Sequence, residues 1–157
     1  MNELVVSHTR VLHVLAGAFF GTTVIYGLLV LLVPPPEAPV VMQTHPLLWI
    51  FGALTVANLL TIMPVYRAML EKPRRVYAVD GRPEPLLAAH RAAHLVALAR
   101  LEAVALLGLV LFFITGRGDW FWYFNGTAIV GMLVLWPLRE KVEALLQAEG
   151  VPTAPTV

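Results

Sequence analysis

Four long apolar stretches constrain the fold of this chain more than any other feature. The stretches 11–33, 46–65 and 120–138 contain no Asp, Glu, Lys or Arg, and 92–115 contains only Arg100 and Glu102. A helix crosses the hydrocarbon core of a bilayer with about 20 apolar residues. Of the 157 residues, 59% are hydrophobic and 13% are charged, whereas soluble domains carry about 25% charge. We therefore predict an all-α membrane protein, a bundle of four transmembrane helices.

Proline and glycine residues mark the expected ends of these helices. Prolines occur at 34–36 and 39, Gly81 is followed by Pro83 and Pro85, and Gly116 and Gly118 precede the last stretch. These residues favour turns and interrupt helices. We expect helices at about 10–33, 46–70, 87–115 and 120–147, in a single transmembrane domain over 1–150. Residues 151–157 are predicted to be a disordered tail.

The positions of Lys and Arg predict the orientation. Basic residues are enriched in the cytoplasmic loops of membrane proteins. Nine of the eleven lie on one predicted side, namely Arg10, Arg67, Lys72, Arg74, Arg75, Arg82, Arg91, Arg139 and Lys141. The pattern predicts a multi-pass protein of a bacterial inner (plasma) membrane with cytoplasmic N- and C-termini. We expect the basic central loop, 67–91, to contact anionic lipid. A net charge of +1 gives no indication of nucleic-acid binding.

The first and second halves of the chain resemble each other. At an offset of 81 residues His13 aligns with His94, and at an offset of 73 Trp49 aligns with Trp122 and Pro64 with Pro137. The alignment predicts two similar hairpins, a parallel repeat about an axis along the membrane normal. The alternative is chance similarity between apolar helices.

Histidines form the first candidate site. His13 and His94 are repeat equivalents at one depth, and His8 and His90 lie nearby toward the cytoplasm. Histidines on facing helices of a bundle can hold haem iron or another metal. We therefore predict His13 and His94 as cofactor-binding residues for haem b or a transition metal, and His8 and His90 as further metal ligands. The alternative is interfacial histidines that contact headgroups or carbonyls.

Glu102 is the second candidate site. Ionisable groups within a membrane are costly and usually face the bundle interior. Glu102 lies near the centre of its apolar stretch, and Asn58 lies near the centre of another. We predict a proton or ion site at Glu102 and Asn58, or alternatively a structural carboxyl group.

Two segments resemble known families. The segment at 10–18, Arg-Val-Leu-His-Val-Leu-Ala-Gly-Ala, resembles the first helix of small bacterial four-helix membrane proteins. These include the CopD-like copper-resistance group and the HemJ-type protoporphyrinogen oxidases, and the second likeness implies haem binding by His13. The segment at 101–113 is similar to the ion-binding helix of rotary ATPase c-subunits, which implies ion binding by Glu102. The glycine-rich partner helix of that family is absent, so we interpret this likeness as convergence.

Three functions remain open from the sequence. The first is membrane redox chemistry with a haem or metal held by the histidine pairs. The second is a structural or assembly subunit of a membrane complex, and the third is a proton or cation conduit at Glu102. The absence of Cys excludes disulfides, thiolate metal sites and cysteine nucleophiles. The sequence does not decide whether the protein is an enzyme, and the Gly17 and Gly21 face could serve a homodimer.

Overall fold

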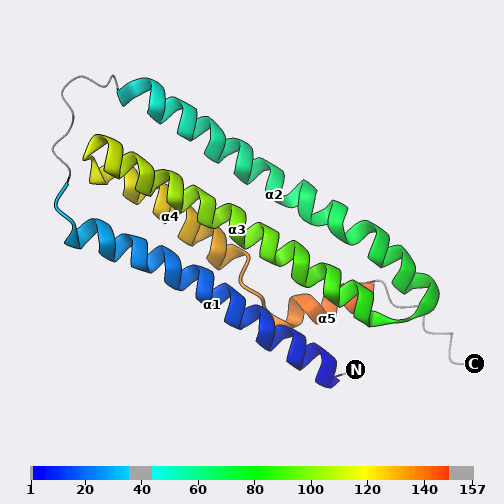
Figure 1. Ribbon diagram of the computed structural model, residues 1–157. Helices are drawn as coiled ribbons and strands as arrows, with labels where there is room; N and C mark the ends of the chain where they lie inside the picture. Colours follow the sequence, from blue (N-terminus) through cyan, green and yellow to red (C-terminus); the bar gives the residue numbers. More distant parts are fainter. Residues whose placement is uncertain (1, 36–43, 149–157) are drawn as a thin grey trace, which may run out of the picture.

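The computed structural model describes residues 2–35 and 44–148, and every regular element within them is helical. Figure 1 shows the five helices, which are α1 (Asn2–Leu32), α2 (Thr44–Asp80), α3 (Pro83–Thr115), α4 (Gly118–Val134) and α5 (Arg139–Ala148). The prediction of an all-α chain is confirmed. The predicted tail and the prolines at 36 and 39 lie outside the described residues.

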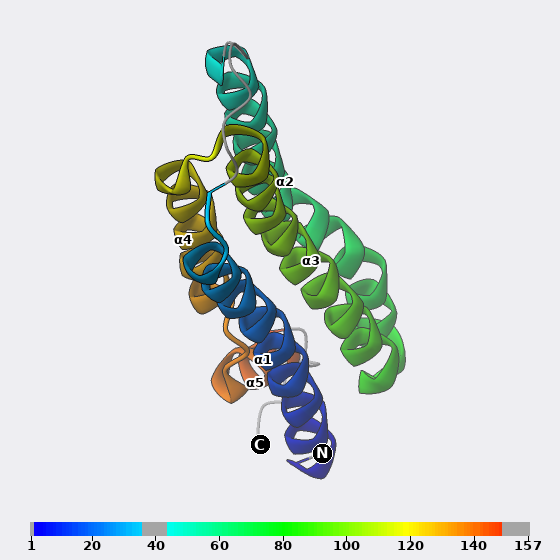
Figure 2. The ribbon, with the colours of Figure 1, turned by 60° about the vertical axis from the view of Figure 1, so that its left-hand side comes forward.

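Helix α3 is the centre of the bundle. It packs against α1, α2 and α4, and α4 also packs against α1. The other long helix, α2, packs chiefly against α3. Successive long helices run in opposite directions, so α1 and α3 are parallel (Figure 1). In the turned view of Figure 2, α1 and α4 lie on one side of α3 and α2 lies on the other.

Helix α1 begins earlier than the sequence pattern predicts. Helices α2 and α3 also extend further toward the turn that joins them. Helix α2 continues through Pro64 and Pro73 to Asp80, and α3 begins at Pro83. The segment expected as a basic central loop is therefore almost entirely helical. Gly81 adopts φ +67° and makes the tight reversal between the two helices, a conformation that side chains with a Cβ atom disfavour.

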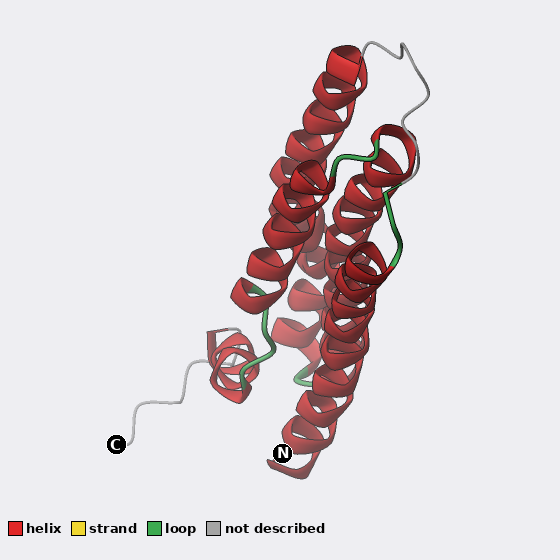
Figure 3. Ribbon diagram, turned by 90° about the vertical axis from the view of Figure 1, so that its left-hand side faces the viewer, coloured by secondary structure: helices red, strands yellow, loops and turns green. Residues whose placement is uncertain are grey.

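The connection between α3 and α4 is equally short (Figure 3). Gly116 has φ +68° and donates its backbone N–H to the carbonyl of Phe112. This left-handed C-terminal glycine satisfies one of the last carbonyl groups of the helix. Helix α4 starts two residues later, so α3 and α4 form a closely packed antiparallel hairpin.

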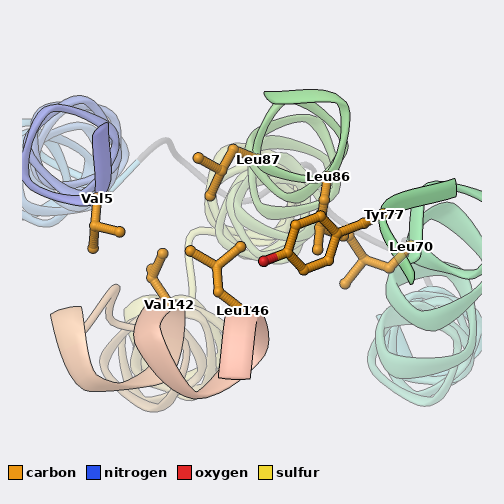
Figure 4. Close-up of a cluster of buried hydrophobic side chains, with 7 residues drawn as sticks. All are labelled: Val5, Leu70, Tyr77, Leu86, Leu87, Val142 and Leu146. Carbon is orange, nitrogen blue, oxygen red and sulfur yellow. The ribbon is translucent and has the colours of Figure 1, made fainter. Parts of the chain in front are cut away.

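The fourth expected helix, 120–147, is two helices in the structure. The chain leaves helical geometry between Val134 and Arg139, and α5 is turned by 54° from α4. Pro137 lies in this break and lacks the backbone N–H that a continuing helix would need. Val142 and Leu146 on α5 are buried and complete a cluster with side chains of α1, α2 and α3 (Figure 4). Helix α5 thus closes one end of the bundle.

Three of the helices, α1, α2 and α3, are long and apolar enough to cross a membrane, and the bent pair α4 and α5 gives a fourth if it is one span. Their outer faces are apolar as well. Trp49 is 76% exposed, Leu60 is 71% exposed and Val14 is 68% exposed. Exposed apolar surface of this extent is unusual for a soluble monomer and is compatible with a membrane protein.

Candidate functional site

Three buried histidines lie together where the first turns of α3 pack against α1. His8 belongs to α1, and His90 and His94 belong to α3. All three are at least 93% buried, with exposed fractions of 2%, 7% and 4%. His90 and His94 are four residues apart and therefore share one face of the helix. Their rings are nearly parallel, with centroids 6.2 Å apart. We call His8, His90 and His94 the histidine cluster.

A hydrogen bond joins the two helices within this cluster. Nε2 of His8 and Nδ1 of His90 are 3.1 Å apart. One of these nitrogens must donate and the other must accept, so at least one of the two rings is neutral in this arrangement. The ring of Tyr66 on α2 meets His90 edge-on, with centroids 6.0 Å apart. The His90 ring is therefore held from two sides.

Two ring nitrogens of the cluster have no hydrogen-bond partner among the residues that the structure describes. These atoms are Nδ1 of His8 and Nε2 of His94, and both are buried. Buried polar atoms are nearly always satisfied by a protein group, a water or a bound ligand. The cluster therefore offers two buried imidazole nitrogens whose partners do not come from the described residues.

His90 and His94 line a cavity of about 550 Å³ between α2, α3 and the α4–α5 break. Most of its wall is apolar, and Tyr66, Trp136, Arg74 and Lys141 also line it. Nζ of Lys141 donates to the carbonyl of Val134 at the end of α4, at 3.2 Å. The cavity therefore joins an apolar wall, two imidazole rings and two cationic side chains. An amphipathic ligand with anionic groups matches this chemistry.

The structure does not group His13 with His94. His13 lies on the exposed side of α1, and its Nδ1 is 2.8 Å from the carbonyl oxygen of Thr9. Its ring meets Trp136 edge-on at 5.9 Å. Five residues separate His8 from His13, and five residues turn a helix by about 140° beyond a full turn. Because His8 faces α3, His13 faces away from it. Trp136 nevertheless links His13 to the cavity wall.

The predicted proton or ion site is also divided. Tyr26 donates its hydroxyl to Oε1 of Glu102 at 3.1 Å. Nδ2 of Asn58 instead donates to the backbone carbonyl of Arg100 at 3.2 Å. Glu102 thus faces α1, whereas Asn58 packs against the α2 side of α3. No hydrogen bond among the described residues joins Glu102 to Asn58.

Within residues 2–35 and 44–148, no group of three or more His, Asp or Glu side chains is placed so that it could hold a metal ion. Within the histidine cluster, His8 and His90 are hydrogen-bonded to each other and His94 is stacked on His90. The geometry of the cluster suits one or two imidazole ligands to a larger group better than a three-ligand metal site.

The sequence did not identify the cavity, because it depends on the break between α4 and α5. Arg74 and Lys141 were interpreted as topology signals, and Trp136 as part of a continuous helix. Pro137 was the one residue in the sequence that could have indicated this break, because a proline interrupts a helix. Asn125 was also missed, although it is 1% exposed and its Oδ1 has no partner among the described residues.

Comparison of the chain with protein-family models, with curated proteins and with solved structures finds no match.

Proposed function

We propose that this chain is an integral membrane protein that crosses a bacterial inner membrane four times, with both termini in the cytoplasm. The three long apolar helices and the bent α4–α5 pair support four crossings. Trp49, Trp122 and Tyr123 are exposed at the end of the bundle away from the histidine cluster, as expected for an aromatic belt at an interface. In this arrangement α5 lies at the cytoplasmic interface.

We further propose that the histidine cluster binds haem b, or a transition metal ion, and serves membrane redox chemistry. The observation that carries this proposal is the buried Nε2 of His94, which has no hydrogen-bond partner within residues 2–35 and 44–148 and belongs to a residue in the cavity wall. A neutral imidazole nitrogen with a free lone pair is the usual haem or metal ligand. The apolar lining and the two cations fit a flat apolar group that carries carboxylates.

Each residue of the site has a distinct role in this proposal. His94 would be the first ligand of the haem or metal. His90 would be either a second ligand or a residue that packs beside the ligated His94. His8 is a positioning residue, because its hydrogen bond fixes the orientation of the His90 ring, as outer groups do for metal-binding histidines. Arg74 and Lys141 would bind the carboxylates of the ligand. Bound haem would supply one-electron chemistry, and the apolar wall would exclude water from it.

Absorption spectroscopy of the purified full-length protein tests the proposal. Cells supplied with haem precursor and iron should yield protein with a Soret band, or protein with a stoichiometric metal by elemental analysis. We expect His94→Ala to lose the band or the metal, and His8→Ala to shift the band. His45→Ala, at the start of α2, is the matched control and should keep the spectrum.

Three results would contradict this assignment. The first is a folded protein without colour or metal, which would instead favour a structural subunit, especially if a partner co-purifies in stoichiometric amount. The second is a spectrum unchanged by His94→Ala. The third is loss of the band in His13→Ala alone, which would place the ligand at the position that the sequence comparison favours.

A further inference from the structure

One side of α3 is left uncovered by the other helices. Over residues 88–113 its exposed apolar residues recur at intervals of three or four, with one gap of seven after Ala99, and Arg91 is exposed as well; the apolar residues are Ala88, Ala92, Leu95, Ala99, Leu106, Val110 and Phe113. Glu102 is half-buried and falls in the same series, between Ala99 and Leu106. Residues spaced in this way form one stripe along a helix. We call this series the α3 stripe. It lies between α1 on one flank and α2 on the other.

The stripe carries a carboxylate on its α1 flank. Glu102 accepts a hydrogen bond from the hydroxyl of Tyr26 on α1. A carboxylate has about four acceptor sites, and this bond uses one of them. Glu102 forms no ion pair with any of the described residues.

A guanidinium group lies on the α2 flank. A terminal nitrogen of Arg100 donates to Oγ1 of Thr61 on α2 at 2.6 Å. Thr61 is exposed and lies two residues from Met63, which lines the cavity of the histidine site. Two residues turn a helix by about 200°, so Thr61 lies on the side of α2 opposite the cavity. The Arg100 head group therefore reaches the uncovered side of the bundle, and it too has no carboxylate partner among the described residues.

The two charged groups lie at nearly the same height along α3. They are two residues apart, which is about 3 Å of helix rise. If the chain is inserted in a membrane, both are deep in the hydrocarbon region, because α3 has more than a dozen residues on either side of them. A lipid chain at that depth offers neither a counter-charge nor a hydrogen bond, which makes charged groups there costly.

We propose that the α3 stripe is the interface with a second copy of this chain, related by a two-fold axis along the membrane normal. A half-turn about an axis parallel to α3 places the α1 flank of one copy opposite the α2 flank of the other and keeps the height unchanged. Arg100 of each copy then meets Glu102 of the other. The interface is isologous, so it forms two identical ion pairs and closes at the dimer.

The shape and chemistry of the α3 stripe support a second copy of the chain as its partner. Alanines at 88, 92 and 99 leave little bulk on the stripe, and small residues allow close approach of membrane helices. A guanidinium group can bind a carboxylate with two parallel hydrogen bonds, which a threonine hydroxyl cannot provide. The Gly17 and Gly21 face of α1 is the rival surface, but its charged residue, Arg10, precedes the apolar stretch 11–33, which itself contains no charged group to pair. The inference rests on the proposed membrane insertion and does not depend on haem or metal binding.

Site-directed cross-linking tests the interface, and the absence of native Cys makes single-cysteine variants unambiguous. Ala99→Cys lies on the stripe, beside the proposed axis. Val14→Cys on α1 and Val130→Cys on α4 are 68% and 61% exposed in the native residue and serve as matched controls. In alkali-washed membrane vesicles treated with iodine, we expect a disulfide-linked dimer from Ala99→Cys and none from the controls.

Exchange of the charges at Arg100 and Glu102 provides a second, independent test of the interface. In the Ala99→Cys background, Arg100→Glu alone and Glu102→Arg alone should each abolish the dimer band, since like charges then meet. The double variant Arg100→Glu with Glu102→Arg should restore it, which a merely misfolded protein would not do.

The possible failures are distinguishable. Membrane-resident protein that gives no dimer, a dimer from Val14→Cys or Val130→Cys instead, or a cross-link to a different protein would overturn the interface and leave membrane insertion intact. Failure of the double variant to restore the dimer would also overturn it. Release of the unmodified protein by the alkaline wash would refute the membrane insertion itself.

Discussion

Helix α3 approaches α4 closely at Gly108, where a single methyl group should have a measurable effect. A Cβ atom at Gly108 of α3 would lie 2.7 Å from Cβ of Phe124 and 3.2 Å from the backbone oxygen of Phe121, both on α4. Carbon atoms pack best at about 3.5–4.0 Å, so α4 would have to retreat by roughly 1 Å. Overpacking of this kind costs about 1–3 kcal/mol, against a gain in helix propensity of about 1 kcal/mol for Gly→Ala. We therefore expect Gly108→Ala to lower the free energy of unfolding by up to about 2 kcal/mol.

Gly126→Ala is the control, because a Cβ atom there meets nothing within 4 Å. It should leave stability unchanged or raise it by up to about 1 kcal/mol. Gly131→Ala should lie between the two, because the atoms it meets belong only to the flexible end of Leu101. Reversible unfolding in mixed detergent micelles, followed by circular dichroism, gives the three values. The packing explanation is refuted if Gly108→Ala is as stable as Gly126→Ala.

Two further predictions follow from the core and from α5. Phe121 is fully buried beside Val30 and Phe112, so Phe121→Ala should lower the free energy of unfolding by about 3–5 kcal/mol; a loss below 1 kcal/mol in the same unfolding assay would contradict the burial. Val142 is fully buried beneath α1, α2 and α3, so Val142→Asp should release α5. Trypsin cleavage after Lys141 should then accelerate by about tenfold for every 1.4 kcal/mol of lost docking, and an unchanged rate would show that α5 is not held by this contact.

The presence of helices was predictable from the sequence, but their ends were not. Apolar runs of about 20 residues indicate helices because few other structures bury so much apolar surface. Proline was the ambiguous signal. Pro64 aligns with Pro137 in the repeat, yet α2 continues through Pro64 whereas α4 ends before Pro137. Beyond Pro64 the chain still packs along α3, while beyond Pro137 the buried face of α5 fits only across the bundle end. The local signal, a proline, is the same at both positions, so tertiary packing determines whether the helix continues past it.

The candidate site could be predicted from the sequence only in part, because it too depends on how the helices pack. The spacing of His90 and His94 predicts a shared helix face, and their rings are stacked in the structure. The repeat alignment favoured His13 as the partner from α1, but helix rotation brings His8 to His90 instead. The alignment of two helices in a sequence repeat does not determine which face of each helix is buried. The cavity, formed by residues far apart in the chain, required the packed structure.

If the chain is inserted in a membrane as proposed, the length of α2 has a consequence for the part of the protein that lies beyond the hydrocarbon core. The 37 residues of α2 span about 55 Å, whereas the hydrocarbon core of a bilayer is about 30 Å thick. Set in a bilayer, the α2–α3 hairpin would therefore extend past the hydrocarbon core to the level of α5, which packs against Tyr77 and Leu86 on either side of its turn. Charges in physiological salt act over about 8 Å, and Arg82 is only five residues from Tyr77, so with α5 at the interface the basic residues of this turn would lie within reach of anionic headgroups. Because Arg82 is exposed, it would also be open to the aqueous phase and to a soluble partner.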